Sequence, residues 1–415
     1  MELKTKYQYT YFIYPYIINE NKYDKYISKL LNNKNLTVRF FEKEKDLDIY
    51  SYFLPTIKDF MFQGFEFNKE KVNKMHEFNK DMQTMILSKY PCTMFEYNLE
   101  QALQGKAGEE EGIFFKIQKI EVICFNTGIC FLAIKTNIED SNAFSDMLNF
   151  NYKFRDIYSE FKELKEYENI RLQTTTFSDV KEIDNLIKEI TGNVADVKEL
   201  DINSNRFLTY AYTCIDQADW NETKQFKDIE FEFFKYANIF PSSYKSNFDK
   251  QHMEILAKWK FIQTGFTKEG MALLTSSIDI HNYTLLPHVF ENQHLYTYIL
   301  VQYQKIYLKK LEKELKQKST TVQAREKFIR FTKELWIQEI THDDVGTNIY
   351  KKARHISEIE KIYNNIKNKF DIAYKELNIE KESKVNKLIL VALGLSLFLN
   401  IINFIALMKM MWVCI

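Results

Sequence analysis

An uncharged stretch close to the C-terminus constrains this chain more than any other feature. Residues 388–408 (LILVALGLSLFLNIINFIALM) are 21 consecutive residues without a charge. As a helix they would span roughly 31 Å, which is about the thickness of the hydrocarbon core of a bilayer. A buried core helix is the alternative, but a helix of that length in a soluble protein usually carries a polar stripe, and this stretch has none. The sequence therefore predicts one transmembrane helix over residues 387–410.

The charges that flank this stretch predict its orientation. Lys381, Lys384 and Lys387 precede it, whereas Lys409 alone follows it, and the positive-inside rule then places the N-terminal part in the cytoplasm. Only seven residues follow Met408, so we expect a tail anchor that inserts late in synthesis. Scarce arginine beside abundant lysine, asparagine and isoleucine is typical of an AT-rich bacterial genome. The predicted location is thus the inner (plasma) membrane of a bacterium, crossed once.

Length and composition narrow the class of the remaining chain. At 415 residues the chain is too long for one compact core, so we expect two or more units before the membrane helix. Lysine plus arginine and aspartate plus glutamate each number 57, and this balance gives no reason to expect a nucleic-acid partner. The cysteines are scattered without a CxxC pair, which fits thiols in a reducing compartment.

The N-terminal part, residues 1–140, reads as α/β. Its clearest signal is residues 112–136, in which two apolar, β-rich runs flank Asn126-Thr127-Gly128, a sequence that can turn a hairpin with glycine at a positive φ. The other expected elements are a strand over 6–18 interrupted near Pro15, a strand over 36–41 and helical spacing over 67–90.

A second α/β part is predicted over residues 141–286. Hydrophobic spacing indicates that residues 180–190 present one apolar helical face, and Gly265 and Gly270 are interpreted as the turn of a strand pair within 265–277. The expected helices are 141–164, 178–191 and 224–237, and the other expected strand is 206–216. The two parts together predict the α+β class.

The character of the sequence changes after Pro287, because proline is absent from there on and Gly346 is the only glycine before the anchor. Residues 287–386 therefore predict a helical stalk, with helices at 288–316 and 320–342, a break at 341–347 and one helix of about 60 residues, roughly 90 Å, running into the membrane. A coiled-coil seam follows steps of four and three. Its residues are Ile359, Tyr363, Ile366, Phe370, Ala373 and Leu377. The seam predicts self-association, and the alternative is that it packs on residues 288–342 of the same chain; the two can coexist.

Motifs of catalysis and metal binding are missing. The sequence has no GxxxxGK[ST], GxGxxG, HExxH or GxSxG and no clustered Cys/His set. His342, Asp343 and Asp344 are interpreted as a polar turn that caps a helix rather than a cation site. We therefore expect no enzyme, no catalytic residues, no metal site and no bound cofactor.

One polar segment, residues 274–284, is a candidate ligand site at the junction with the stalk. Its donors, with a nearby lysine, could hold a small anionic ligand, and a nucleotide-type second messenger or a divalent cation is the kind of ligand considered. The residues are Lys268, Thr275, Ser276, Ser277, Asn282 and Tyr283. The alternative is a capped connection whose side chains bond to their own backbone.

Two amides interrupt the membrane stretch. Asn400 and Asn403 predict contacts between helices of an oligomer or the lining of a pore, and Gly394 would allow close helix packing. The alternative is that the asparagines lie toward the far interface of the bilayer.

The helical segments ENQHLYTYILVQYQKIYLKK (291–310) and REKFIRFTKELWIQEIT (325–341), with the hairpin FNTGICFLAI (125–134), resemble divergent CorA-like bacterial membrane proteins. The resemblance covers residues 112–415 and rests on layout. CorA-type magnesium channels carry a Gly-Met-Asn signature at the end of the first of two membrane helices, whereas this chain has no such tripeptide and space for one crossing. Divergent members that lack the signature occur beside type III CRISPR systems and act as membrane effectors gated by a nucleotide second messenger.

The resemblance implies a homo-oligomeric, membrane-anchored effector or channel-like protein, gated by a small ligand through its cytosolic domain and serving antiviral defence. The alternative is a tail-anchored binding or scaffold protein without transport activity.

Overall fold

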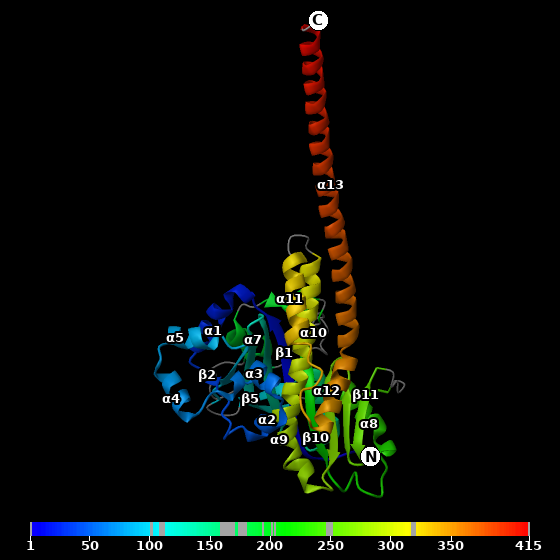
Figure 1. Cartoon of the computed structure of the whole chain (residues 1–415). Coiled ribbons are helices and arrows are strands. Elements are labelled where there is room, and N and C mark those ends of the chain that lie inside the picture. Colours follow the sequence, from blue (N-terminus) through cyan, green and yellow to red (C-terminus); the bar gives the residue numbers. More distant parts are fainter. Residues whose placement is uncertain are drawn as a thin grey trace.

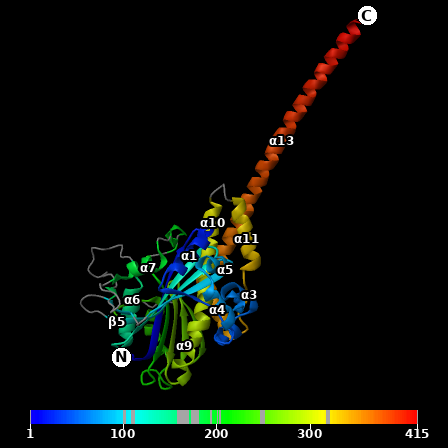
Figure 2. The ribbon, with the colours of Figure 1, turned by 90° about the vertical axis from the view of Figure 1, so that its left-hand side faces the viewer.

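The computed structural model describes residues 2–99, 103–107, 113–157, 171–172, 181–192, 195–200, 202, 205–245, 252–316 and 321–413. These residues form a mixed α/β head from which one long helix projects, as two perpendicular views show (Figures 1 and 2). The α+β class is thereby confirmed.

One mixed sheet organises the head. In the described part of the chain, 13 strands are connected by hydrogen bonds. They are β1 (Thr5–Ile17), β2 (Leu36–Arg39), β3 (Cys92–Tyr97), β4 (Leu103–Ala107), β5 (Ile113–Phe125), β6 (Ile129–Ile138), β7 (Arg171–Leu172), β8 (Lys181–Glu182), β9 (Ala195–Asp196), β10 (Leu208–Ile215), β11 (Glu254–Trp259), β12 (Ile262–Phe266) and β13 (Gly270–Ser276). The main order is β11-β12-β13-β10-β1-β6-β5-β4-β7-β8; β2 joins through β3, which pairs with β5, and β9 pairs with β1. The strands pair antiparallel except β10 and β13, which are parallel.

Strand β1 joins the two predicted α/β parts. It pairs with β6 on one side and with β10 on the other, so the sheet crosses the boundary predicted at residue 140. The predicted interruption near Pro15 is wrong, because Pro15 lies in register with Phe131. Pairing with β10 ends at Ile13 and pairing with β9 begins at Tyr16, so Pro15 lies in the gap between two neighbours, where its missing N–H costs little.

The predicted hairpin is confirmed as β5 and β6. Gly128 has φ +83°, and a Cβ there would lie 2.3 Å from the carbonyl oxygen of Ile18, so the turn requires glycine. The second predicted pair is confirmed as β12 and β13, but Gly265 lies inside β12, close to Ala237 and Phe233. The turn uses residues 267–269 instead, and β11 was not predicted.

The sheet buries both faces, because the residues of β1 alternate between two hydrophobic cores. Phe12 and Tyr16 belong to the first core, and Tyr11 and Ile13 to the second. The helices whose side chains enter the first core are α1 (Tyr23–Asn32), α4 (Lys69–Glu77), α5 (Lys80–Leu87), α6 (Phe144–Phe154), α7 (Ile183–Thr191) and α8 (Glu230–Asn238). The second core is covered by α2 (Leu47–Tyr52), α3 (Pro55–Met61) and the C-terminal helices described below.

The predicted helices of the head are found with altered ends. Asn79 caps α5 by accepting a hydrogen bond from the backbone of Met82, so residues 67–90 form two helices rather than one. Helix α6 begins after Ala143 without a side-chain cap, and residues 158–164 of its predicted extent lie outside the described residues, as do residues 178–180 of the next helix. The apolar face predicted for α7 is confirmed, whereas the 224–237 prediction corresponds to a 3₁₀ turn (Phe226–Asp228) followed by α8.

The C-terminal helices begin with one continuous rod. Helix α9 (Leu286–Val289) passes through a π-helical turn (Phe290–His294) into α10 (Leu295–Leu315). Helix α11 (Thr321–Glu334) is shorter than predicted, and Asp343 caps α12 (Asp344–Ile356) by accepting a hydrogen bond from the Gly346 N–H at 2.7 Å.

Helix α13 (Ile359–Val413) is a single helix of 55 residues, roughly 82 Å long. The prediction of one unbroken helix from residue 347 into the membrane is wrong at one point. Glu358 has φ +55°, in the left-handed region, and this residue separates α12 from α13. We call residues 357–358 the joint.

The predicted seam packs within the chain over its first half. Ile359, Ile366 and Phe370 are buried in the second core with α10 and α11. Ala373 is half-buried, and the side chain of Leu377 lies outside what is described. The intramolecular alternative therefore accounts for the start of the seam, and a coiled coil between chains stays a prediction.

Candidate functional site

One helix in the described part of the chain is long and apolar enough to cross a membrane. It is the segment Glu382–Lys409 of α13, 28 residues of which none in the most apolar window is buried. Both views show this segment extending away from the head (Figures 1 and 2). The predicted C-terminal apolar helix is therefore present and free of the chain's own core.

Aromatic contacts hold the lower part of the same helix to the head. The Tyr363 ring stacks on Trp336, with centroids 4.0 Å apart. The Phe370 ring lies over Phe328 on α11, with centroids 5.1 Å apart. The apolar segment is thus the direct continuation of a helix that is part of the folded head.

Arg354, on α12 just before the joint, contacts several of the helices that pack around the start of α13. Its side chain is buried, donates to the carbonyl oxygen of Ile337 at 2.9 Å and pairs with Glu360 of α13 at 2.9 Å. It also lies over the Trp336 ring and donates to Gln304 of α10. One guanidinium therefore links α10, α12, α13 and the segment that follows α11.

A largely buried ion pair joins the α9–α10 rod to the sheet at the π-helical turn. Glu291 accepts from the Nζ of Lys135 on β6 at 2.6 Å and from the Tyr11 hydroxyl of β1 at 2.5 Å. Burial alone would raise the pKa of the Glu291 carboxyl, but the Lys135 charge and these two hydrogen bonds outweigh it and hold the pKa below its usual value. The π-turn is thus held by an ionised carboxylate.

The same turn carries a buried histidine. Burial lowers the pKa of His294 to about 4, although Asp343 acts in the opposite direction. Its Nδ1 has no hydrogen-bond partner in the described chain. His294 and Asp343, together with Tyr52 and His342, line a cavity of 620 Å³ between α2, the rod formed by α9 and α10, and the start of α12. His294 is therefore neutral in the folded protein at neutral pH.

This histidine predicts a pH-dependent stability. In the unfolded chain His294 takes up a proton near pH 6.5, whereas the folded state resists it until about pH 4. Stability from this group is complete above pH 6.5 and is lost as the pH falls toward 4, by about 2 kcal/mol at pH 5. In His294→Gln, the measured free energy of unfolding should no longer fall in this way as the pH is lowered. The matched variant His281→Gln, whose side chain is 64% exposed, should keep it; equal slopes in both variants would contradict the assignment.

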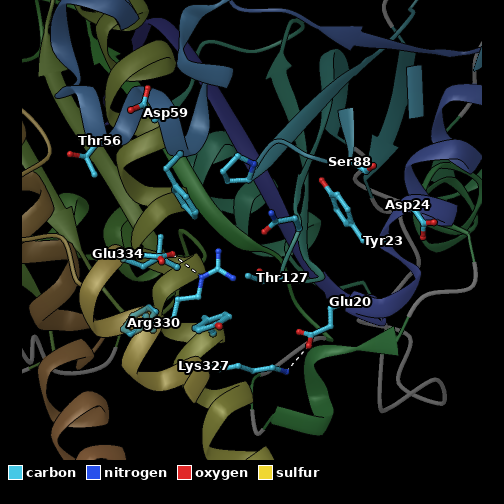
Figure 3. Close-up of a pocket in the computed structure, with 16 residues that line it drawn as sticks. Glu20, Tyr23, Asp24, Thr56, Asp59, Ser88, Thr127, Lys327, Arg330 and Glu334 are labelled. Carbon is cyan, nitrogen blue, oxygen red and sulfur yellow. Dashed lines mark hydrogen bonds and ion pairs between the residues drawn. The ribbon is translucent and has the colours of Figure 1, made fainter. Parts of the chain in front are cut away.

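The cavity drawn in Figure 3 lies between the α10–α11 hairpin and the head and has a volume of 610 Å³. Its cations are already paired: Lys327 with Glu20 at 2.5 Å and Arg330 with Glu334 at 2.9 Å (Figure 3). Asp59 adds a further carboxylate. The Lys327–Glu20 pair joins the α10–α11 hairpin to the rest of the head, and with both cations paired this cavity is not a site for an anion.

The structure does not gather the predicted ligand residues into one site. Lys268 lies in the β12–β13 turn, whereas Ser276 ends β13 at the opposite end of the strand. Ser276 donates to the carbonyl oxygen of Trp220, and Asn282 donates to that of Ser276 at 2.9 Å.

The remaining members of that group are also part of the connection. Ser277 accepts from the backbone of Gln217, and Lys6 lies over the Tyr283 ring. Thr275 is buried, with no hydrogen-bond partner for its Oγ1 in the described chain. These contacts are those of a capped connection, and Lys268 alone lies beside the joint.

The predicted membrane residues lie on α13 without contacts from the head. Asn400 and Asn403 are exposed, and nothing lies within 4 Å of a Cβ built on Gly394. In the described residues no group of three or more His, Cys, Asp or Glu side chains could hold a metal ion.

Comparison of the chain with protein-family models, curated proteins and solved structures finds no match.

Sequence reasoning missed the largely buried ion pair of Glu291 with Lys135, the buried guanidinium of Arg354 and the buried, neutral His294. The sequence did carry a signal for one further partly buried cation, Lys305 on α10. Val301, four residues before it, and Leu308, three residues after it, are both buried, so Lys305 lies on the side of the helix that faces the core.

Proposed function

We propose that this chain is a homo-oligomeric, membrane-anchored effector of the channel type, gated by a small ligand through its cytosolic head. The observation that carries the proposal is the continuity of α13: Ile366 and Phe370 are buried in the head, and the same helix continues as the apolar segment Glu382–Lys409. A helix is stiff along its axis, so a change in how its foot packs would move the segment in the bilayer. The resemblance to divergent CorA-like effectors supports a role in antiviral defence.

Orientation follows from the flanking charges. Lys381, Lys384 and Lys387 precede the apolar segment and Lys409 follows it, which favours a cytoplasmic head at the inner membrane of a bacterium.

Self-association would use the part of α13 that the head leaves uncovered. Ile372 and Ile379 are 58% and 65% exposed and lie one heptad apart, as in a coiled-coil seam. Higher up, Asn400 and Asn403 offer amide groups that hydrogen-bond across helices in a membrane. A second candidate, a tail-anchored scaffold, is favoured by the single apolar segment without internal contacts, since an anchor needs no more.

The channel-type effector and the tail-anchored scaffold differ in whether they need the side-chain amides of Asn400 and Asn403. Under our proposal, Asn400→Leu with Asn403→Leu abolishes the dye permeability and growth arrest caused by induced expression of the full chain in bacteria, and lowers the mass of the cross-linked particle in detergent. The matched control, Ile401→Leu with Ile405→Leu, should behave as wild type. Carbonate extraction should leave both variants in the membrane. Wild-type permeability and mass in the asparagine double variant would overturn the channel and favour the scaffold.

A further inference from the structure

A third, smaller cavity lies at the start of α13. It has a volume of 280 Å³ and is enclosed by the β12–β13 turn, the middle of α10, the segment before β10 and the joint. Its charged lining is mainly positive, with four cations against two carboxylates. These residues are Arg206, Lys268, Lys305, Lys309, Glu269 and Glu358.

Two of the cations form no ion pair within the described residues. Lys305 and Lys309 are half-buried, and neither forms an ion pair with a described carboxylate, in contrast to the cations of the cavity in Figure 3. Burial lowers the pKa of Lys305, and the charges of Lys309 and Lys268 lower it further, whereas Glu358 and Glu269 act in the opposite direction without restoring it. Arg206 is held by Asp156 at 2.7 Å. The cavity thus contains positive charge that a bound anion would stabilise.

The joint itself contributes a carboxylate to this cavity. The Glu358 carboxylate lies 3.9 Å from the Nζ of Lys268 and 3.2 Å from that of Lys361. Its backbone has φ +55°, a conformation that a residue with a side chain holds only when its surroundings favour it. The residue that separates α12 from α13 is therefore also one of the two carboxylates that line the cavity.

We propose that this cavity binds a phosphoryl group of a soluble ligand through Lys305 and Lys309, and that the bound anion competes with Glu358 for Lys268. This inference rests on the proposed function for its consequence, the gating of α13, but not for the binding itself. Lysine ammonium groups are compact donors that suit phosphate oxygens. The cavity is below the usual range for a whole drug-sized ligand, so the phosphoryl group enters and the remainder of a larger ligand stays outside.

The geometry excludes a lipid headgroup as the source. The joint precedes the start of the apolar segment, Glu382, by 24 residues, which is roughly 36 Å of helix. A headgroup at the membrane surface cannot reach the foot of α13.

Coupling between the anion and the joint is reciprocal. An anion that displaces Glu358 from Lys268 removes an interaction that holds the left-handed joint, and α13 is then free to change its angle to the head. Conversely, removal of the Glu358 charge should tighten anion binding.

Titration calorimetry of the purified full chain in detergent, with inorganic phosphate and with pyrophosphate as probes, tests the site. We expect saturable binding, a loss of affinity of about tenfold in Lys305→Met, since one charge-assisted contact is removed, and tighter binding in Glu358→Gln. Replacement of a half-buried, unpaired lysine by methionine does not threaten the fold. Lys327→Met, in the cavity of Figure 3, is the matched control and should bind as wild type does.

The proposal is overturned if wild type shows no saturable binding, if Lys305→Met binds as tightly as wild type, or if chloride at equal ionic strength competes as well as phosphate. Weaker binding in Glu358→Gln would overturn the competition at the joint. Binding is measured without a membrane and is therefore independent of the permeability assay. Saturable phosphate binding by a protein that causes no permeability would support the binding site and contradict the channel.

Discussion

Replacement of Glu291 by glutamine should destabilise the folded chain by about 3–5 kcal/mol. The variant removes the carboxylate that neutralises Lys135, and the two side chains are only 15% and 12% exposed. Lys135 would remain among the rings of Tyr9 and Tyr11 as a buried charge without a carboxylate partner. Denaturant unfolding of the full chain in detergent measures the loss.

A double-mutant cycle shows whether loss of the Glu291–Lys135 ion pair causes the loss of stability. Glu291→Gln combined with Lys135→Met should cost clearly less than the sum of the two single changes, because the double variant leaves no unpaired charge. The exposed pair Arg330–Glu334, whose side chains are 74% and 55% exposed, is the control, and Glu334→Gln should cost less than about 1 kcal/mol. Additive costs at Glu291 and Lys135 would contradict a coupled pair.

Arg354→Met should cost about 3 kcal/mol and should also loosen the foot of α13. The guanidinium is buried, and the charged hydrogen bonds that it makes to Ile337 and Glu360 are each 2.9 Å long; such bonds contribute roughly 1.5–3 kcal/mol apiece. The variant also loses the cation–π contact with Trp336. Unfolding measurements give the energy, and limited proteolysis at residues 357–358 reports the loosening.

Arg330→Met is the matched variant, because Arg330 is exposed and its one carboxylate partner is four residues away on the same helix. It should change stability by less than about 1 kcal/mol and leave the proteolysis rate unchanged. If Arg354→Met resisted protease as wild type does, Arg354 would not be what holds α13 to α12.

Local sequence patterns were sufficient to predict several elements of the fold. The hairpin at Gly128 is set by a three-residue turn between two β-rich runs, and the face of α7 by the spacing of Ile183, Leu186 and Ile190. The same holds for the cap at Asp343, whose partner is three residues away. In each case the interactions that decide the element lie close together in the sequence.

Prediction failed where distant residues decide the outcome. The break at Glu358 has no proline or glycine in the sequence to signal it, and the helices on its two sides, α12 and α13, both pack against the distant α10. The grouping of Lys268 with Ser276 failed because β13 lies between them and holds them at opposite ends of a strand.

The apolar stretch after Lys387 was the most secure inference from the sequence, since its length and lack of charge depend on no partner. The sequence by itself determined that one helix near the C-terminus is apolar enough to cross a bilayer, that a hairpin turns at Gly128, and that the described chain after Pro287 is mainly helical. Only the tertiary structure showed that the α/β parts share one sheet and that the seam of α13 is partly used within the chain. It alone brought Lys268, Lys305, Lys309 and Glu358 around one cavity. The physical reason is that periodicity and turn chemistry act over a few residues, whereas the pairing of charges and the direction of a helix depend on which surfaces meet after folding.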